Sequence, residues 1–82
     1  MLQKLLNLTI TRVDGPVFDG SVISVIVPSH AGQLELLANH EPLIAPLKAG
    51  IIRLKHQDGT VETLELKMGT LEMSNNHATI LI

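Results

Sequence analysis

The chain has 82 residues, of which 45% are hydrophobic and 17% are charged, and its formal net charge is -2. This balance excludes a disordered chain, and no apolar run approaches the roughly 18 residues of a membrane-spanning helix, so direct membrane insertion is not expected. Cysteine is absent, which excludes disulfides and thiolate metal sites, and Phe18 is the only aromatic residue, so without a basic stripe nucleic-acid binding is not expected either.

The length predicts one domain, residues 1–82, with a thin core that a stable partner would help. The first ten residues are interpreted as a strand and not as a signal peptide, because Asn7 and Thr9 interrupt the apolar stretch and no small-residue cleavage site follows. Alternating apolar and polar residues continue to residue 11, and the Asp-Gly-Pro sequence at residues 14–16 then predicts a turn.

A short stub at residues 17–18, closed by Asp-Gly at residues 19–20, is expected after this turn. Residues 21–27 are rich in β-branched side chains and end at Pro28, which is typical of one buried strand.

The segment from residue 32 to residue 50 has the most closely spaced turn signals in the chain. Two leucines alternate with Gln33 and Glu35, which predicts a half-buried strand over residues 33–37. The Asn-His-Glu-Pro sequence at residues 39–42 predicts an exposed turn, after which a second apolar patch begins. That patch consists of Leu43, Ile44 and Leu47. An ordinary hairpin needs fewer turn signals, so a functional surface is expected here.

Residues 51–56 and 61–68 are predicted to form a hairpin, because Asp58-Gly59 suits a tight turn between them. The residues expected to point inward are Ile52, Leu54, Leu64, Leu66 and Met68. The residues expected to point outward, with cross-strand charge pairs among them, are Arg53, Lys55, Glu65 and Lys67.

A last pair of strands is predicted over residues 70–73 and 77–82, joined by a turn at residues 74–76. Short strands with frequent turn signals, and no helical period of useful length, predict an all-β fold. We expect a two-sheet antiparallel β-sandwich of short strands.

Patterns that carry catalysis or bind metal are weak in this chain. Among its four histidines, only His40 has a close acidic neighbour, Glu41, and Ser29 and His30 would point in opposite directions on an extended chain. No glycine-rich phosphate loop precedes a helix. We therefore predict no catalytic residue, no metal ligand and no cofactor, and a binding or scaffolding role in place of an enzymatic one.

Four motifs, taken in order, carry a family resemblance. They are Phe18-Asp19-Gly20, GQLELLANHEPL at residues 32–43, LKAGIIR at residues 47–53, and GTLEM at residues 69–73. The string resembles the N-terminal β-sandwich domain of the epsilon subunit of F-type rotary ATP synthases, which is called delta in mitochondria. The resemblance covers nearly the whole chain.

This resemblance implies a non-catalytic central-stalk subunit that couples the gamma subunit to the membrane rotor ring of c subunits during proton- or ion-driven ATP synthesis. It also implies a cytoplasmic position, peripheral at the inner face of the plasma membrane. The alternative is a free-standing β-sandwich module that binds a peptide or another ligand. A stalk subunit would present an extended aliphatic face, whereas a ligand module would have a concave pocket with convergent polar groups.

The resemblance further implies a ring-facing edge at Gln33 and His40, the positions of a glutamate and a histidine in the family. Gln33 lacks that acid, and we hypothesise that Glu35 and Glu41 replace it, because residues two apart on a strand share a face and Glu41 adjoins His40. The competing interpretation is that both glutamates are merely solvated charges beside a turn.

The gamma-facing positions of the family fall near Arg12 and Ala45. Met68-Gly69 and Ala38-Asn39 replace a Gly-Gly and a Pro-Gly of the family, and because asparagine tolerates positive φ, the fold is expected to survive. Many members continue into a two-helix arm beyond the position of Ile82, so the inhibitory and nucleotide-binding roles of that arm are not carried over.

Overall fold

The computed structural model describes residues 4–82, and every regular element in this part of the chain is a β-strand. The strands are β1 (Leu6–Arg12), β2 (Gly15–Val22), β3 (Ser24–Ser29), β4 (Gly32–Leu37), β5 (Leu43–Leu47), β6 (Gly50–Lys55), β7 (Val61–Leu66), β8 (Gly69–Ser74) and β9 (His77–Leu81). The strand expected over the first ten residues is present from Leu6, while residues 1–3 lie outside the described residues.

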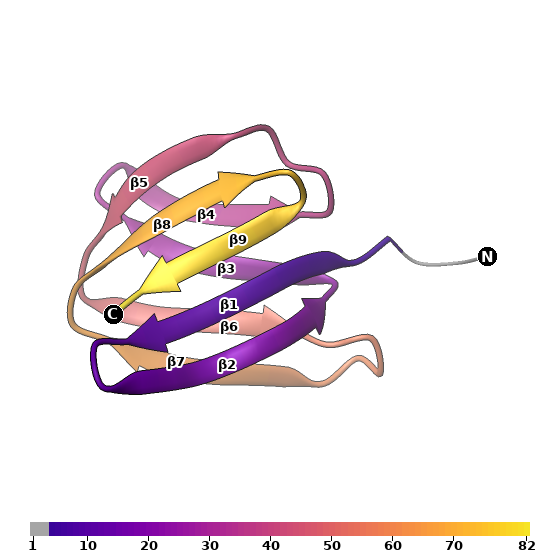
Figure 1. The fold of residues 1–82 in the computed structure, drawn as a ribbon, viewed down its shortest axis with the longest axis horizontal. Coiled ribbons are helices and arrows are strands. Elements are labelled where there is room, and N and C mark those ends of the chain that lie inside the picture. Colours follow the sequence, from indigo (N-terminus) through magenta and orange to yellow (C-terminus); the bar gives the residue numbers. More distant parts are fainter. Residues whose placement is uncertain (1–3) are drawn as a thin grey trace.

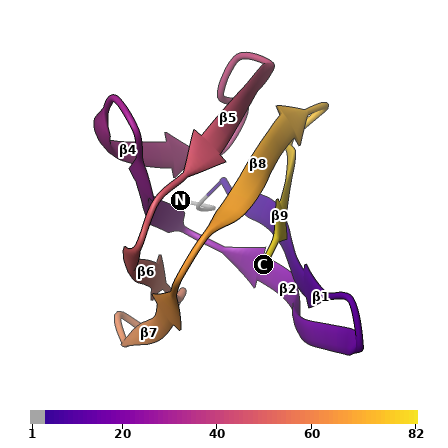
Figure 2. The same cartoon turned by 90° about the vertical axis from the view of Figure 1, so that its left-hand side faces the viewer.

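The strands form one curled sheet that folds into two layers (Figures 1 and 2). The five-stranded layer has the order β2-β1-β9-β8-β5, and the four-stranded layer has the order β4-β3-β6-β7. A single pairing of Ser29 with Leu47 joins β3 to β5 at the corner between the layers. The expected all-β sandwich is confirmed.

One pair departs from the antiparallel pattern. β1 and β9 run parallel, with Leu8 opposite Ala78 and Ile10 opposite Ile80, whereas the other pairs are antiparallel. Parallel neighbours cannot be joined by a tight turn, and here the connection between them consists of seven intervening strands. The first and last strands thus lie side by side in the five-stranded layer (Figure 1).

The core lies between the two layers and is aliphatic. In β1, β6 and β8 buried and more exposed residues alternate, as the period-two pattern predicts, whereas β3 is buried at nearly every position. The buried apolar residues are Leu6, Leu8, Ile10, Val22, Val25, Val27, Leu36, Leu47, Ile52, Leu54, Leu66, Leu71, Met73, Ala78 and Ile80.

The expected single strand over residues 21–27 is wrong. Val22 pairs with Leu6 in one layer, whereas Ser24 pairs with Lys55 in the other. Between them the Ile23 amide donates to the Lys55 carbonyl at 2.8 Å, so the chain crosses from one layer to the other within a segment rich in β-branched residues. The expected stub at residues 17–18 is part of a full strand, because β2 pairs with β1 from Gly15 onward.

Two details of the predicted hairpin also need correction. Met68 is 74% exposed and follows the end of β7, so it does not face inward with Leu66. The cross-strand charge pairs do not form, because the register places Arg53 opposite Thr63 and Lys55 opposite Val61. Within residues 4–82, the one salt bridge joins His56 Nε2 to a Glu62 carboxylate oxygen at 2.9 Å.

Candidate functional site

β4 is an edge strand, and this places the first predicted site residues. It pairs only with β3, and its inner residue Leu36 is buried against the core. Gln33 and Glu35 lie on the opposite, outer face with Leu37, which is 52% exposed. Gln33 and Glu35 therefore share one face of the strand, as predicted.

His40 and Glu41 lie in the connection between β4 and β5, beyond the far end of β4. The His40 amide donates to the Leu37 carbonyl at 3.2 Å, and the His40 ring donates through Nδ1 to the Glu41 carbonyl oxygen at 2.9 Å. Asn39, with φ of 63°, takes the positive φ that its identity was expected to allow.

An asparagine that the sequence analysis missed holds this connection in place. The Asn76 side-chain oxygen accepts from the Asn39 amide at 2.8 Å, and its amide nitrogen donates to the Leu5 carbonyl at 2.9 Å. One side chain in the β8–β9 turn therefore links the β4–β5 connection to the segment before β1. Sequence spacing gave no signal, because 37 residues separate Asn39 from Asn76.

The four predicted ring-facing residues form a line and not a cluster. Four residue steps along a strand from Gln33 to Leu37 span about 13 Å, and His40 and Glu41 follow beyond that end. Within the described part of the chain, neither the Glu35 nor the Glu41 carboxylate takes part in an ion pair or a hydrogen bond. We call Gln33, Glu35, His40 and Glu41 the β4 edge.

Arg12 and Ala45 are not brought together. Arg12 is exposed at the end of β1, whereas Ala45 is half-buried on β5, in the inward-facing row of that strand. Strands β9 and β8 lie between β1 and β5, so about 14 Å of sheet separates the two residues' strands.

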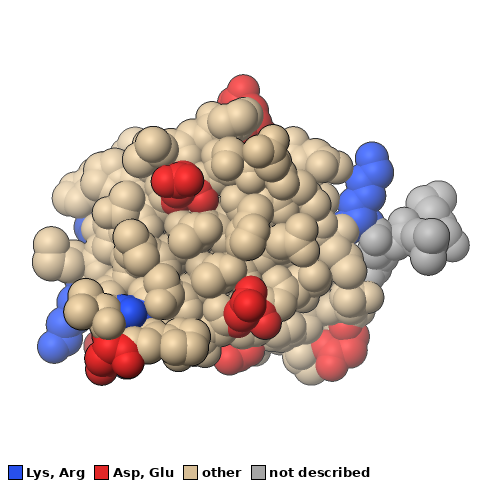
Figure 3. Space-filling model, in the orientation of Figure 1, with Lys and Arg blue, Asp and Glu red and all other residues tan. Residues whose placement is uncertain are grey.

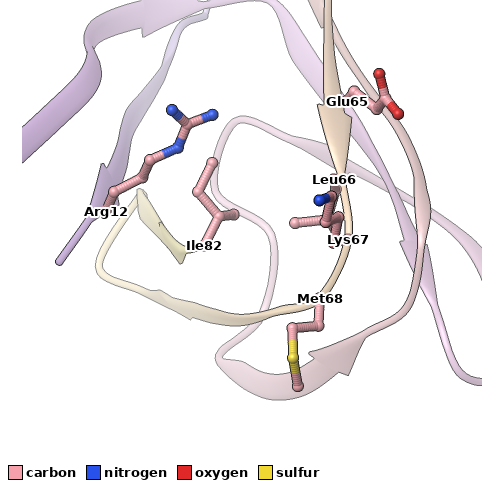
Figure 4. Close-up of a pocket in the computed structure, with 6 residues that line it drawn as sticks. All are labelled: Arg12, Glu65, Leu66, Lys67, Met68 and Ile82. Atoms are coloured by element: carbon pink, nitrogen blue, oxygen red, sulfur yellow. The ribbon is translucent and has the colours of Figure 1, made fainter. Parts of the chain in front are cut away.

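Arg12 instead lines a pocket of about 480 Å³ at the end of the sandwich where β1 and β7 finish. Figure 4 shows Arg12 reaching in from one side and Leu66 and Lys67 lining the other, with Ile82 between them. Met68 and Glu65 complete the lining. The sequence analysis treated Lys67 and Met68 only as hairpin residues and gave no role to Ile82.

The outer face of the five-stranded layer carries hydroxyl and amide groups. The His77 ring donates through Nε2 to the Thr9 hydroxyl at 2.8 Å, and that hydroxyl donates to Asp19 at 3.1 Å. Figure 3 shows this face as mostly uncharged, with a few separate acidic side chains on it and basic side chains at its margins. Because the Thr9 hydroxyl donates its proton to Asp19, His77 is not positioned to act as a base toward that hydroxyl.

Residues 4–82 contain no group of three or more His, Asp or Glu side chains arranged to hold a metal ion. None of the elements in this range is a helix of the length and apolarity needed to cross a membrane.

Comparison with known proteins places the whole described chain in one family. A family model described as "ATP synthase, Delta/Epsilon chain, beta-sandwich domain" matches residues 5–82. An ATP synthase epsilon chain of Latilactobacillus sakei is 42% identical over 80 residues, which cover 95% of this chain and 55% of the relative. This chain therefore spans little more than half the length of that relative.

Two solved structures share the fold. A chain in the Euglena gracilis mitochondrial ATP synthase assembly of OSCP, F1 and c-ring superimposes with a TM-score of 0.88 at 20% identity. The superposition covers 99% of this chain and 51% of the Euglena chain. A chain in the central stalk and c-ring assembly of Tetrahymena thermophila mitochondrial ATP synthase superimposes with a TM-score of 0.78 at 11% identity. That superposition covers 99% of this chain and 65% of the Tetrahymena chain.

Proposed function

Because this chain belongs to the delta/epsilon β-sandwich family of ATP synthases, we propose that it is a non-catalytic subunit of the central stalk. In this role it couples the gamma subunit to the rotor ring of c subunits during proton- or ion-driven ATP synthesis. It acts by being held between two partners, at the cytoplasmic side of the plasma membrane, and it carries out no chemical step of its own.

The family match over residues 5–82 is the observation that carries this proposal. The name of the Latilactobacillus relative, and the F1, central-stalk and c-ring assemblies that contain the structural neighbours, support the same role. A free-standing ligand module has no comparable support from relatives of this similarity.

The β4 edge is the surface that we assign to the rotor ring. Its acids, Glu35 and Glu41, are exposed and make no ion pair within the described residues, so both carboxylates are available to a basic partner. They supply the negative charge that Gln33 lacks. Arg12 and Ala45 are the gamma-facing positions in this proposal.

The proposal is tested by mixing the purified chain with the gamma subunit of the same organism and measuring the mass of the complex under native conditions. A stoichiometric complex is expected, and adding the isolated c-ring to it should yield a ternary assembly. A chain that stays monomeric in both mixtures would overturn the proposed function.

A further inference from the structure

Three Asp-Gly pairs occur in this chain, at residues 14–15, 19–20 and 58–59. In such a pair the glycine amide nitrogen can attack the side-chain carboxyl carbon of the aspartate and close a five-membered succinimide ring. Glycine favours this reaction because it has no Cβ to hinder the approach and because its backbone is flexible. The reaction also needs a carboxyl group that is free to turn toward the next amide, and the three pairs differ in this respect.

The pair at residues 58–59 is held by hydrogen bonds on both of its reacting groups. The Asp58 carboxylate accepts from the Thr60 hydroxyl at 2.7 Å and from the Thr60 amide at 2.9 Å. The Gly59 amide, which would be the nucleophile, donates to the His56 carbonyl at 3.0 Å. The Thr60 bonds, the hydroxyl first, also lower the pKa of Asp58, and an ionised carboxylate is a poor electrophile. Ring closure here requires these bonds to break.

The pair at residues 19–20 is held inside a strand. Asp19 lies opposite Thr9 in the pairing of β2 with β1, and its carboxylate accepts from the Thr9 hydroxyl at 3.1 Å. Gly20 is paired as well, and the Phe18 ring lies 3.3 Å from the position that a Cβ of Gly20 would occupy. Pairing on the strand limits the change in backbone dihedral angles that ring closure needs.

The pair at residues 14–15 has neither form of restraint on its carboxyl group. Arg12 and Gly15 are the last paired residues of β1 and β2, so Val13 and Asp14 form the tip of this hairpin (Figure 1). Both tip residues are exposed, and within residues 4–82 the Asp14 carboxylate forms no hydrogen bond or ion pair. Hairpin tips of this kind open more readily than paired strands. The Asp14 side chain is therefore free to turn toward the Gly15 amide.

We propose that Asp14 is a site of spontaneous isoaspartate formation, and that the fold protects Asp19 and Asp58 from the same reaction. The Gly15 nitrogen forms a bond to Asp14 Cγ, and one carboxyl oxygen leaves as water with the amide hydrogen and the carboxyl proton. Water then opens the ring, either at Cγ to restore aspartate or at the main-chain carbonyl carbon to give isoaspartate. In isoaspartate the peptide chain runs through Cβ and Cγ, so one extra methylene separates Arg12 from Gly15 and disturbs their pairing.

This inference is independent of the proposed function. The protecting hydrogen bonds all lie within residues 9–60. The test incubates the purified chain in mildly acidic buffer, below its unfolding temperature. Isoaspartate at each pair is followed by peptide mapping with electron-transfer fragmentation, which distinguishes isoaspartate from aspartate.

The isoaspartate at residue 14 should accumulate at least about fivefold faster than at residue 19 or 58, because each hydrogen bond that must break raises the barrier. In concentrated urea the protecting bonds are lost, so the rates at the three pairs should converge. This comparison separates the effect of the fold from the effect of the local sequence.

Three variants sharpen the assignment. Asp14→Glu keeps the charge but would need a six-membered ring, so it should remove the product at residue 14 and leave the other pairs unchanged. Thr60→Ala removes the hydroxyl bond to Asp58 and should speed the reaction at residue 58 by about fivefold. Thr63→Ala is its matched control, because Thr63 forms no hydrogen bond with Asp58, and it should alter none of the rates. Thermal unfolding of each variant checks that the fold is retained.

Three outcomes would overturn the proposal. One is equal accumulation at the three pairs of the folded chain, or faster accumulation at residue 19 or 58 than at residue 14. Another is a ranking in the folded chain that persists in urea, because the local sequence and not the fold would then decide the rates. The third is a signal at residue 14 that does not exceed the background of Asp14→Glu.

Discussion

The β4 edge and the pocket lined by Arg12 differ in charge, because the edge has two acids whereas the pocket has two bases beside one acid, Glu65. β4 forms one edge of the four-stranded layer and β7, which leads into Lys67, forms the other. Residues 32–43 contain two glutamates and no lysine or arginine, whereas the pocket contains Arg12 and Lys67. An acidic surface and a basic surface select oppositely charged partners, which is the kind of discrimination that the proposed function requires.

The two surfaces also differ in how the chain builds them. Ten consecutive residues, 32–41, supply the whole β4 edge, whereas the pocket draws on the end of β1, the end of β7 and residue 82. An edge of this kind depends on one strand staying attached to the sheet, and a pocket of that kind depends on the packing of both layers.

Removing the anchor of β4 should have the largest effect and should break the edge. Leu36 is fully buried, and Leu36→Ala is expected to destabilise the fold by about 2–5 kcal/mol through lost burial and the remaining cavity. Urea unfolding measures the change. Leu37→Ala is the matched control, because Leu37 is 52% exposed on the same strand and should cost less than about 1 kcal/mol. Equal losses in the two variants would show that β4 is not held by its inner face.

Reversing the charge of the edge tests whether Glu35 and Glu41 are docking groups. The double variant Glu35→Lys and Glu41→Lys should weaken association with the c-ring by about tenfold at 0.01 M ionic strength, and much less at about 0.15 M, because salt screens exposed charges. Glu72→Lys, an exposed acid on β8 in the other layer, is the control. A ring affinity that neither the double variant nor salt alters would support the interpretation of both glutamates as merely solvated charges.

The bonds of Asn76 offer a smaller perturbation that reaches the same edge from a distance. Asn76→Ala removes its side-chain bonds to the Asn39 amide and the Leu5 carbonyl, and should destabilise the chain by about 1–2 kcal/mol more than Asn75→Ala. Asn75 is a close control, because it shares the positive φ of Asn76, at 49° against 57°. The difference between the free energies of unfolding of the two variants isolates the contribution of the hydrogen bonds. Equal free energies of unfolding would contradict their proposed role.

Local pattern predicted most of the fold and the position of Gln33 and Glu35 on one face of β4. Strict alternation identified β1, β4, β6 and the final strands, because each of these buries one face and leaves the other in water. It failed at Ile23, because the segment on both sides of this residue is rich in β-branched side chains while the chain changes layers. Local propensity cannot report such a crossing, since both sides of it are extended.

The pocket and the Asn76 bonds could not be predicted from the sequence, for a different reason. Lys67 and Ile82 become neighbours of Arg12 only through the parallel pairing of β1 with β9 and the closure of the two layers. No spacing rule for strands joins residues 12 and 82. The resemblance to a family led us to expect a gamma-facing position near Arg12, and only the structure shows which side chains lie around Arg12.

The smallest expected effect concerns a carboxylate that, unlike Glu35 and Glu41, is bonded within the chain. The Thr60 hydroxyl donates to Asp58 at 2.7 Å and the Thr60 amide at 2.9 Å, and these bonds lower the pKa of Asp58, the hydroxyl most strongly. A lowered folded-state pKa stabilises the fold above the unfolded pKa of about 3.9, and that contribution is lost as the pH falls through the folded pKa. Thr60→Ala should therefore raise the pKa of Asp58 and flatten the dependence of stability on pH in this acidic range.

Titration of the Asp58 carboxyl carbon by NMR measures this shift. Thr63→Ala is the control on the strand that follows, because Thr63 forms no hydrogen bond with Asp58 and should leave its titration unchanged. If Thr60→Ala leaves the pKa of Asp58 where it was, the amide alone accounts for the lowering, and the hydroxyl does not tie this carboxylate to the chain. Asp58 would then be held by the Thr60 amide alone, and that single bond would distinguish it from the unbonded carboxylates of the β4 edge.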